Sequence, residues 1–142
     1  MTQQTQYIFE PFAETIEYRT VNGEIVRGWV EVMKQKGAKG IEGLLDIATG
    51  VGTMVQLFLW NLPKDWKQPL FVCLDKSAEA LEQVKAQLGP TLGSNLRLIH
   101  SPVEEIDIPD NSLDVAVWGN GIHYLDAEGQ EEALRSIKRV LK

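Results

Sequence analysis

The sequence has little of what several classes of protein require. It contains one cysteine, Cys73, so no disulfide can form within the chain, and its two histidines, His100 and His123, do not form a metal-binding pattern with it. No apolar run approaches the roughly 20 residues that span a membrane. The first residues also lack the basic and then apolar order of a signal peptide. We therefore predict a cytoplasmic protein with no metal site and no membrane contact, and Cys73 as a buried core residue.

The sequence also has fewer basic residues than acidic ones. Fourteen Lys and Arg residues stand against 20 Asp and Glu, which gives a net charge of −6, and the basic residues are scattered along the chain. This pattern argues against a surface for nucleic acid. At 142 residues the chain is long enough for one domain with a real core but too short for two. A small-molecule substrate fits this composition better than a nucleic acid.

What the chain does contain is an alternation of helix and strand patterns. Helices are indicated by apolar residues at helical spacing, and strands by short apolar runs that end at acidic or turn residues. The expected helices are one around residues 25–33 that ends at 37–40, one over 53–62, one capped by Ser77 that stops at Gly89-Pro90, and a last one with Leu134, Ile137 and Leu141 on one face; the expected strands are 44–47, 70–74, 96–99 and 113–118.

Strands that alternate with helices predict an α/β fold with a mostly parallel sheet and helices on both faces, which is a three-layer α-β-α sandwich. We expect a single domain in which residues 1–40 form an N-terminal flap and helix over one end, and residues 41–142 form the core.

The unusual segments of the sequence all follow predicted strands. They are the turn 46–52, Asp75, the stretch 100–104 and the stretch 118–123. In an open parallel sheet, ligands bind beyond the carboxyl ends of the strands, near the point where the strand order reverses. We therefore expect these four segments to surround one ligand. Trp118 either lines this site or belongs to the core.

The glycine turn reads Asp46-Ile47-Ala48-Thr49-Gly50-Val51-Gly52. It is not a dinucleotide fingerprint, because Val55 stands where G-x-G-x-x-G has its third glycine, and it is not a P-loop, because no Gly-Lys-Ser/Thr follows. An acidic strand end would repel a pyrophosphate but suits a ligand with a positive charge. The two glycines allow that ligand to approach the backbone closely.

With these residues, the segment 44–141 resembles the class I S-adenosylmethionine-dependent methyltransferases. Their first motif is an acidic residue followed by G-x-G-x-G, and here Ala48 takes the first glycine position. Their second strand ends in an acidic residue that binds the ribose, which Asp75 matches in VCLDKSAEALEQVK. The stretch HSPVEEIDIPDNSLDVAVWGNGIHYL is similar to their third and fourth motifs.

The resemblance implies a Rossmann-like methyltransferase fold, S-adenosylmethionine as cofactor and an unidentified small-molecule methyl acceptor. Pro102 replaces the aspartate that many members place against the adenine amino group, which transfers this contact to Glu104. His123 is the candidate general base, and the alternative is a histidine with no part in proton transfer. The resemblance assigns the cofactor to Asp46, Ala48, Thr49, Gly50, Gly52, Asp75, Lys76, Pro102, Val103, Glu104 and Gly119.

The same resemblance makes the end of the sequence notable. The family continues with further C-terminal strands, which are missing here, so we expect either a fragment of a longer protein or a homodimer through an uncovered sheet edge. A noncatalytic module that binds the same cofactor or a protein partner stays open as an alternative. A nicotinamide-dependent oxidoreductase is disfavoured by Val55 and by the acidic strand end.

Overall fold

A computed structural model describes residues 16–119 and 122–142 of the chain. The expected flap within residues 1–15 lies outside the described residues, as do residues 120 and 121 of the stretch 118–123. The elements, in order along the chain, are α2 (Ile16–Gln35), β1 (Gly43–Ile47), α3 (Thr53–Asn61), β2 (Leu70–Asp75), α4 (Ala78–Leu92), η1 (Gly93–Asn95), β3 (Leu96–His100), η2 (Val103–Glu105), β4 (Val115–Val117), η3 (Ile122–Tyr124) and α5 (Ala127–Val140).

The four strands form one parallel sheet, as the sequence predicts. Their order is β3-β2-β1-β4, and every neighbouring pair is parallel. The chain therefore moves outward from β1 to β3 on one side and then returns to place β4 on the other side of β1. The strand order reverses between β1 and β4, so the carboxyl ends of these two strands mark the position where ligands bind in such sheets.

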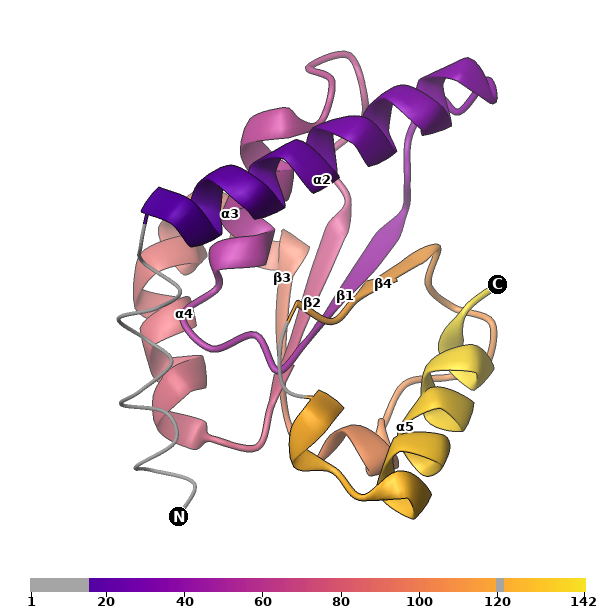
Figure 1. The fold of residues 1–142 in the computed structure, drawn as a ribbon. Helices are drawn as coiled ribbons and strands as arrows, with labels where there is room; N and C mark the ends of the chain where they lie inside the picture. Colours follow the sequence, from indigo (N-terminus) through magenta and orange to yellow (C-terminus); the bar gives the residue numbers. More distant parts are fainter. Residues whose placement is uncertain (1–15, 120–121) are drawn as a thin grey trace.

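Helices cover both faces of the sheet (Figure 1). One core contains residues of α2, α3 and α4 with Leu44, and the other contains residues of α5 and η2 with Leu45 and Ile47. Because side chains alternate along a strand, Asp46 belongs to the same face as Leu44, between its register partners Cys73 and Val117. The predicted three-layer α-β-α architecture is confirmed. None of the helices within the described ranges is long and apolar enough to span a bilayer.

Helix α2 is fixed along α3. Val26 and Val30 are buried in the core, and the ring of Trp29 meets that of Phe58 edge to face, with centroids 5.6 Å apart. The Arg19 guanidinium donates to the Gln56 side chain at 3.2 Å. These contacts hold the first turns of α2 beside the start of α3, which is where the glycine turn ends.

The predicted stop of α4 is wrong. The helix runs through Gly89 and Pro90 and ends at Leu92, and Gly93, with a φ of 53°, provides the C-cap. A proline this close to the end removes only one helical hydrogen bond, while continuation buries Leu92 in the core. The glycine with positive φ is the real terminator.

The last strand and helix also differ from the prediction. Strand β4 is shorter than 113–118, and Leu113 makes only an isolated parallel bridge with Leu141, which lies beyond the end of α5. Leu134 is 54% exposed, whereas Ala133 and Val140 are fully buried. Ile137 packs against the core as predicted, but Ala133 rather than Leu134 faces inward, because α5 packs against η2 through its smallest apolar residue.

Candidate cofactor site

The turn after β1 has the backbone that its glycines predict. Gly50 and Gly52 have φ angles of 56° and 82°, and Ala48, in the first glycine position, is also left-handed at 54°. Few residues other than glycine adopt this conformation, so a small residue is required there. The Thr49 amide donates to the carbonyl of Leu74 at 3.1 Å, which ties the turn to the end of β2.

Asp75 joins the two turns that flank the site. One carboxylate oxygen accepts the Gly50 amide at 3.0 Å, and the other accepts the Ser77 amide at 2.9 Å. Ser77 in turn accepts from the Ala80 amide and caps α4, as predicted. Each oxygen of an ionised carboxylate has a second lone pair, so Asp75 can still accept hydroxyl groups from a ligand.

Asp46 lies beneath the turn rather than on its surface. The residue is 1% exposed, and one carboxylate oxygen accepts the Thr49 hydroxyl at 2.7 Å. Burial raises the pKa of the Asp46 carboxyl to about 7; the Thr49 hydrogen bond opposes this shift, and the charge of Asp75 adds to it. Because this pKa is close to neutral pH, a positive charge placed above the turn would favour the ionised form of the carboxyl.

Three glycines of the site leave room for different neighbours. A Cβ on Gly50 would meet nothing within 4 Å, so the space beside this residue is open. A Cβ on Gly52 would lie 3.0 Å from the Leu88 side chain of α4, and one on Gly119 would lie 3.1 Å from the Tyr18 hydroxyl. Gly52 therefore allows helix packing, Gly119 admits Tyr18, and only Gly50 faces free space.

Tyr18 is a candidate site residue that the sequence analysis missed. It lies on the first turns of α2, yet its hydroxyl reaches the end of β4 at Gly119. Burial raises the pKa of the Tyr18 phenol, and the charge of Asp46 raises it further. The phenol is thus a neutral group close enough to Asp46 to sense its charge. Tyr18 lies far from the motifs along the chain, so nothing in the sequence indicated that it would reach them.

The end of β3 brings the next predicted residues beside Asp75. The Ser101 amide donates to the Asp75 carbonyl at 3.1 Å, and His100 bonds to the Lys76 carbonyl through Nε2 at 3.0 Å. Pro102 is exposed and Val103 is buried, and Glu104 lies half-buried on η2. The predicted adenine loop therefore adjoins the predicted ribose carboxylate.

His123 lies on η3, which follows β4. Its side chain is exposed and its ring contacts that of Tyr124, with centroids 4.2 Å apart. Trp118 packs against the core on the α5 face, which favours the core interpretation. Cys73 is fully buried, as predicted, and burial raises the pKa of its thiol to about 12.

In the described part of the chain, three buried polar atoms without a partner come after strands of the sheet. Among residues 16–119 and 122–142, three buried side-chain atoms have no hydrogen-bond partner: Thr53 Oγ1, Ser101 Oγ and Trp118 Nε1. They follow β1, β3 and β4 respectively, and such groups are rare unless a ligand or water completes them. Asp46, Asp75 and the open space at Gly50 fit a cationic nucleoside. In the same described ranges, no three His, Cys, Asp or Glu side chains gather as a metal site.

A parallel α/β sheet with acidic residues at two neighbouring strand ends defines a Rossmann-like nucleoside-binding protein. The methyltransferase domain family matches residues 44–142, and the chain belongs to this family. The prediction of a class I S-adenosylmethionine-dependent methyltransferase domain is thereby confirmed. Among curated proteins, no relative matches the sequence significantly.

Solved structures share the fold at low sequence identity. An S-adenosylmethionine-dependent methyltransferase from Aquifex aeolicus matches 80% of this chain with a TM-score of 0.60 and 20% identity. The 1,6-didemethyltoxoflavin-N1-methyltransferase of Burkholderia thailandensis, solved with bound 1,6-didemethyltoxoflavin and S-adenosylhomocysteine, matches 82% with a TM-score of 0.63 and 19% identity. A Pyrococcus horikoshii protein matches 91% with a TM-score of 0.64 and 21% identity. The chain spans about half the length of these proteins, 58%, 47% and 52% respectively.

Gly50→Ala and Gly52→Ala should separate backbone strain from packing. Both residues have positive φ, which costs a side chain roughly 1–2 kcal/mol. Only Gly52 also faces α4, so Gly52→Ala should lose a further 1–3 kcal/mol or so from overpacking against Leu88. Urea unfolding of both variants measures the difference. Equal losses would show that the turn does not pack against α4 as described.

The stability of the ligand-free protein should fall as the pH rises from about 4 to 7. The Asp46 pKa is about 7 in the folded state against 3.8 for the free group, so between these values the folded state holds a proton that the unfolded state releases. The total loss is about 4 kcal/mol at 1.36 kcal/mol for each pKa unit. Urea unfolding between pH 4 and 8 should show this slope in the wild type and lose it in Asp46→Asn. The same slope in both proteins would contradict the assignment.

Proposed function

We propose that this chain binds S-adenosylmethionine at the carboxyl edge of its sheet and transfers the methyl group to a small-molecule acceptor. The observation that carries the proposal is the buried Asp46 carboxyl beneath an open glycine turn, with Asp75 one strand away. A carboxyl with a raised pKa and a neighbouring acceptor of hydroxyl groups suit the two ends of this cofactor, an amino acid cation and a ribose. When bound, the cofactor supplies a methyl group already activated on a sulfonium.

The residues of the chain bind and orient the cofactor in this proposal. Asp46 acts from below the turn, through its charge and through Thr49, while Ala48, Gly50 and Gly52 present bare backbone to the amino acid end. Asp75 accepts the ribose hydroxyl groups, with Lys76 beside it. Val103 and Glu104 hold the base behind Pro102, and Gly119 borders the methyl group. The alignment of the acceptor atom with the methyl group, in a site that excludes water, supplies much of the rate of such a transfer.

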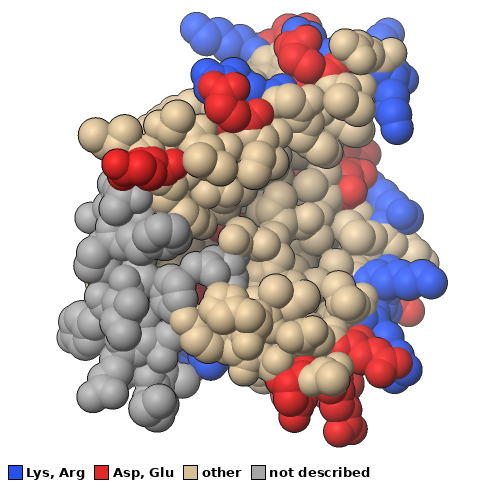
Figure 2. All heavy atoms as spheres, in the orientation of Figure 1, with Lys and Arg blue, Asp and Glu red and all other residues tan. Residues whose placement is uncertain are grey.

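The acceptor is a small molecule of no strong negative charge in this proposal. Figure 2 shows charged side chains of both signs along the top, right and bottom of one face, while the described part of its middle is mostly uncharged. The net charge of −6 disfavours polyanionic acceptors. His123 is exposed on η3, from which it can serve as the general base for an alcohol or carbon nucleophile. A cytoplasmic location and a homodimer through the edge of β4 remain predictions.

Ligand binding tests the proposal directly. At 100 times its Kd, S-adenosylhomocysteine should stabilise the protein by about 2.7 kcal/mol, whereas NAD should not raise the melting temperature. Because the ligand's ammonium group favours ionised Asp46, affinity should increase between pH 6 and 8, and Gly50→Ala should weaken it by filling the open space. Stabilisation by NAD alone would contradict the proposal. Stabilisation by S-adenosylhomocysteine without methyl transfer to a panel of phenols, carboxylates and amines would favour the noncatalytic module.

Tyr18→Phe tests whether α2 completes the cofactor site. Removal of the hydroxyl beside Gly119 should weaken S-adenosylhomocysteine binding by roughly three- to tenfold, as expected for one lost hydrogen bond, with little loss of stability. Calorimetric titration of the variant and the wild type measures this. Val21→Ala, on an exposed position of the same helix, is the matched control. Unchanged affinity in Tyr18→Phe would place the phenol outside the site.

A further inference from the structure

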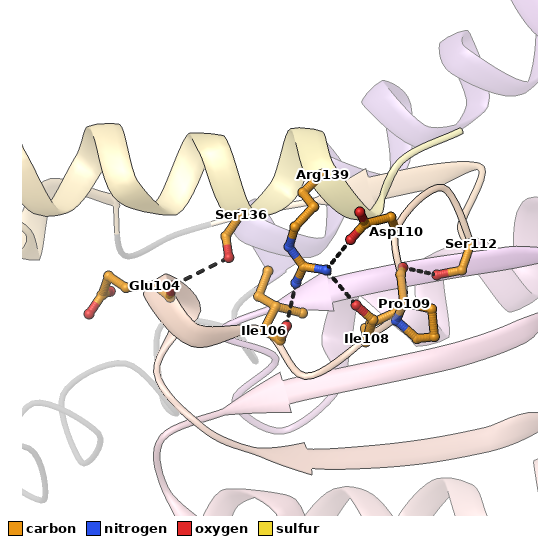
Figure 3. Close-up of polar contacts among 8 residues, drawn as sticks. All are labelled: Glu104, Ile106, Ile108, Pro109, Asp110, Ser112, Ser136 and Arg139. Carbon is orange, nitrogen blue, oxygen red and sulfur yellow. Dashed lines mark hydrogen bonds and ion pairs between the residues drawn. The ribbon is translucent and has the colours of Figure 1, made fainter.

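The loop between β3 and β4 is held by side chains of α5 rather than by a neighbouring strand. Three of its carbonyl oxygens, at alternate residues, accept hydrogen bonds from this helix (Figure 3). The Ser136 hydroxyl donates to the Glu104 carbonyl at 3.3 Å. The Arg139 guanidinium donates to the carbonyls of Ile106 and Ile108 at 2.5 and 2.7 Å. These backbone groups lie outside any sheet ladder, so α5 supplies the partners that they need.

The chemistry of arginine suits this task. Its planar guanidinium carries five donors in a rigid fork, so it can bond to two carbonyls and also to the Asp110 carboxylate, which it reaches at 2.8 Å. A lysine ammonium is a point charge that lacks this fork. The loop also donates to the helix, because the Asn111 amide bonds to the Arg139 carbonyl at 2.9 Å. Hydrogen bonds therefore run from α5 to the loop and from the loop to α5.

The same loop carries the residue assigned to the base. Val103 and Ile106 are buried on either side of Glu104, so the backbone is fixed on both sides of it. The Glu104 carbonyl is turned toward Ser136, and Figure 3 shows its carboxylate pointing away from α5. The direction of the carboxylate therefore depends on how α5 holds the carbonyls of Glu104 and Ile106.

We propose that Ser136 and Arg139 are positioning residues that set the preference of this site for a 6-amino purine by fixing Glu104. The proposal rests on the proposed function. A carboxylate accepts a hydrogen bond from the amino group of adenine, but it faces the oxygen of a 6-oxo purine as one acceptor against another. If the loop were free to shift, the site would lose its preference for the 6-amino purine before it lost its overall affinity for the ligand. The reason is that Asp46 and Asp75 bind the other parts of the ligand.

The test compares two ligands that differ only in the base, S-adenosylhomocysteine and S-inosylhomocysteine. Titration calorimetry gives both Kd values for the wild type, Ser136→Ala, Arg139→Met and Arg139→Lys, with the melting temperature of each protein alone. The wild type should prefer the adenine ligand about tenfold or more, as expected for a hydrogen bond to a charged group. Ser136→Ala and Arg139→Met should lower this ratio by about threefold or more with little change in the inosine Kd, and Arg139→Lys should restore it only in part.

Two controls separate positioning from simple stability. Arg135→Met removes an exposed guanidinium that pairs with Glu131 on the same helix, and it should leave the ratio unchanged. In Glu104→Ala the ratio should already be lost, and adding Arg139→Met should lower it no further, since the two residues act through one contact. If Arg139→Met does not fold, Ser136→Ala, which removes one hydrogen bond, carries the test.

The outcomes are distinct. Equal loss of affinity for both ligands in the Ser136 and Arg139 variants, or no loss for either, would overturn the proposal and leave the proposed function intact. A wild type that binds both ligands equally would also overturn it, because Glu104 would then not read the base. A wild type that binds neither ligand would instead contradict the proposed function.

Discussion

A buried carboxyl group is the constraint on which the site depends. Asp46 lies on the central strand, away from water, with the Thr49 hydroxyl as its partner. An isolated charge in such a place is costly, so burial raises the pKa of this carboxyl to about 7, and a nearby cation would favour its ionised form. The left-handed turn directly above it, the open space at Gly50 and the approach of Tyr18 all place such a cation within the field of this carboxyl.

The rest of the site is held together by contacts between segments far apart in the sequence. Asp75 binds the amide of Gly50, so the end of β2 fixes the turn after β1. Arg139 and Ser136 of α5 fix the loop after β3, and Gly119 after β4 makes room for Tyr18 of α2. The turn after β1 and the loop after β3 are thus fixed by different elements. A nucleoside bound there would contact a surface prepared in advance, which lowers the entropic cost of binding.

The comparison of sequence and structure shows which signals are reliable. The parallel sheet, the glycine turn and the Ser77 cap were predictable, because local chemistry decides them: apolar runs, positive φ and an N-cap hydroxyl. The inward face of α5 was predictable only in part, at Ile137, since Leu134 and Ala133 are equally apolar choices until the helix is placed against η2. The end of α4 was decided by the burial of Leu92, which outweighs the break that Gly89-Pro90 indicates.

By itself, the sequence determined the fold class, the family and the residues that follow each strand, because periodicity and turn chemistry are local properties of the chain. Only the tertiary structure decided that Asp46 lies buried beneath the turn, that Tyr18 approaches Gly119 and that Arg139 holds the loop of Glu104. The contacts of Tyr18 and Arg139 join segments far apart in the sequence, and their geometry exists only once the helices have packed on the sheet.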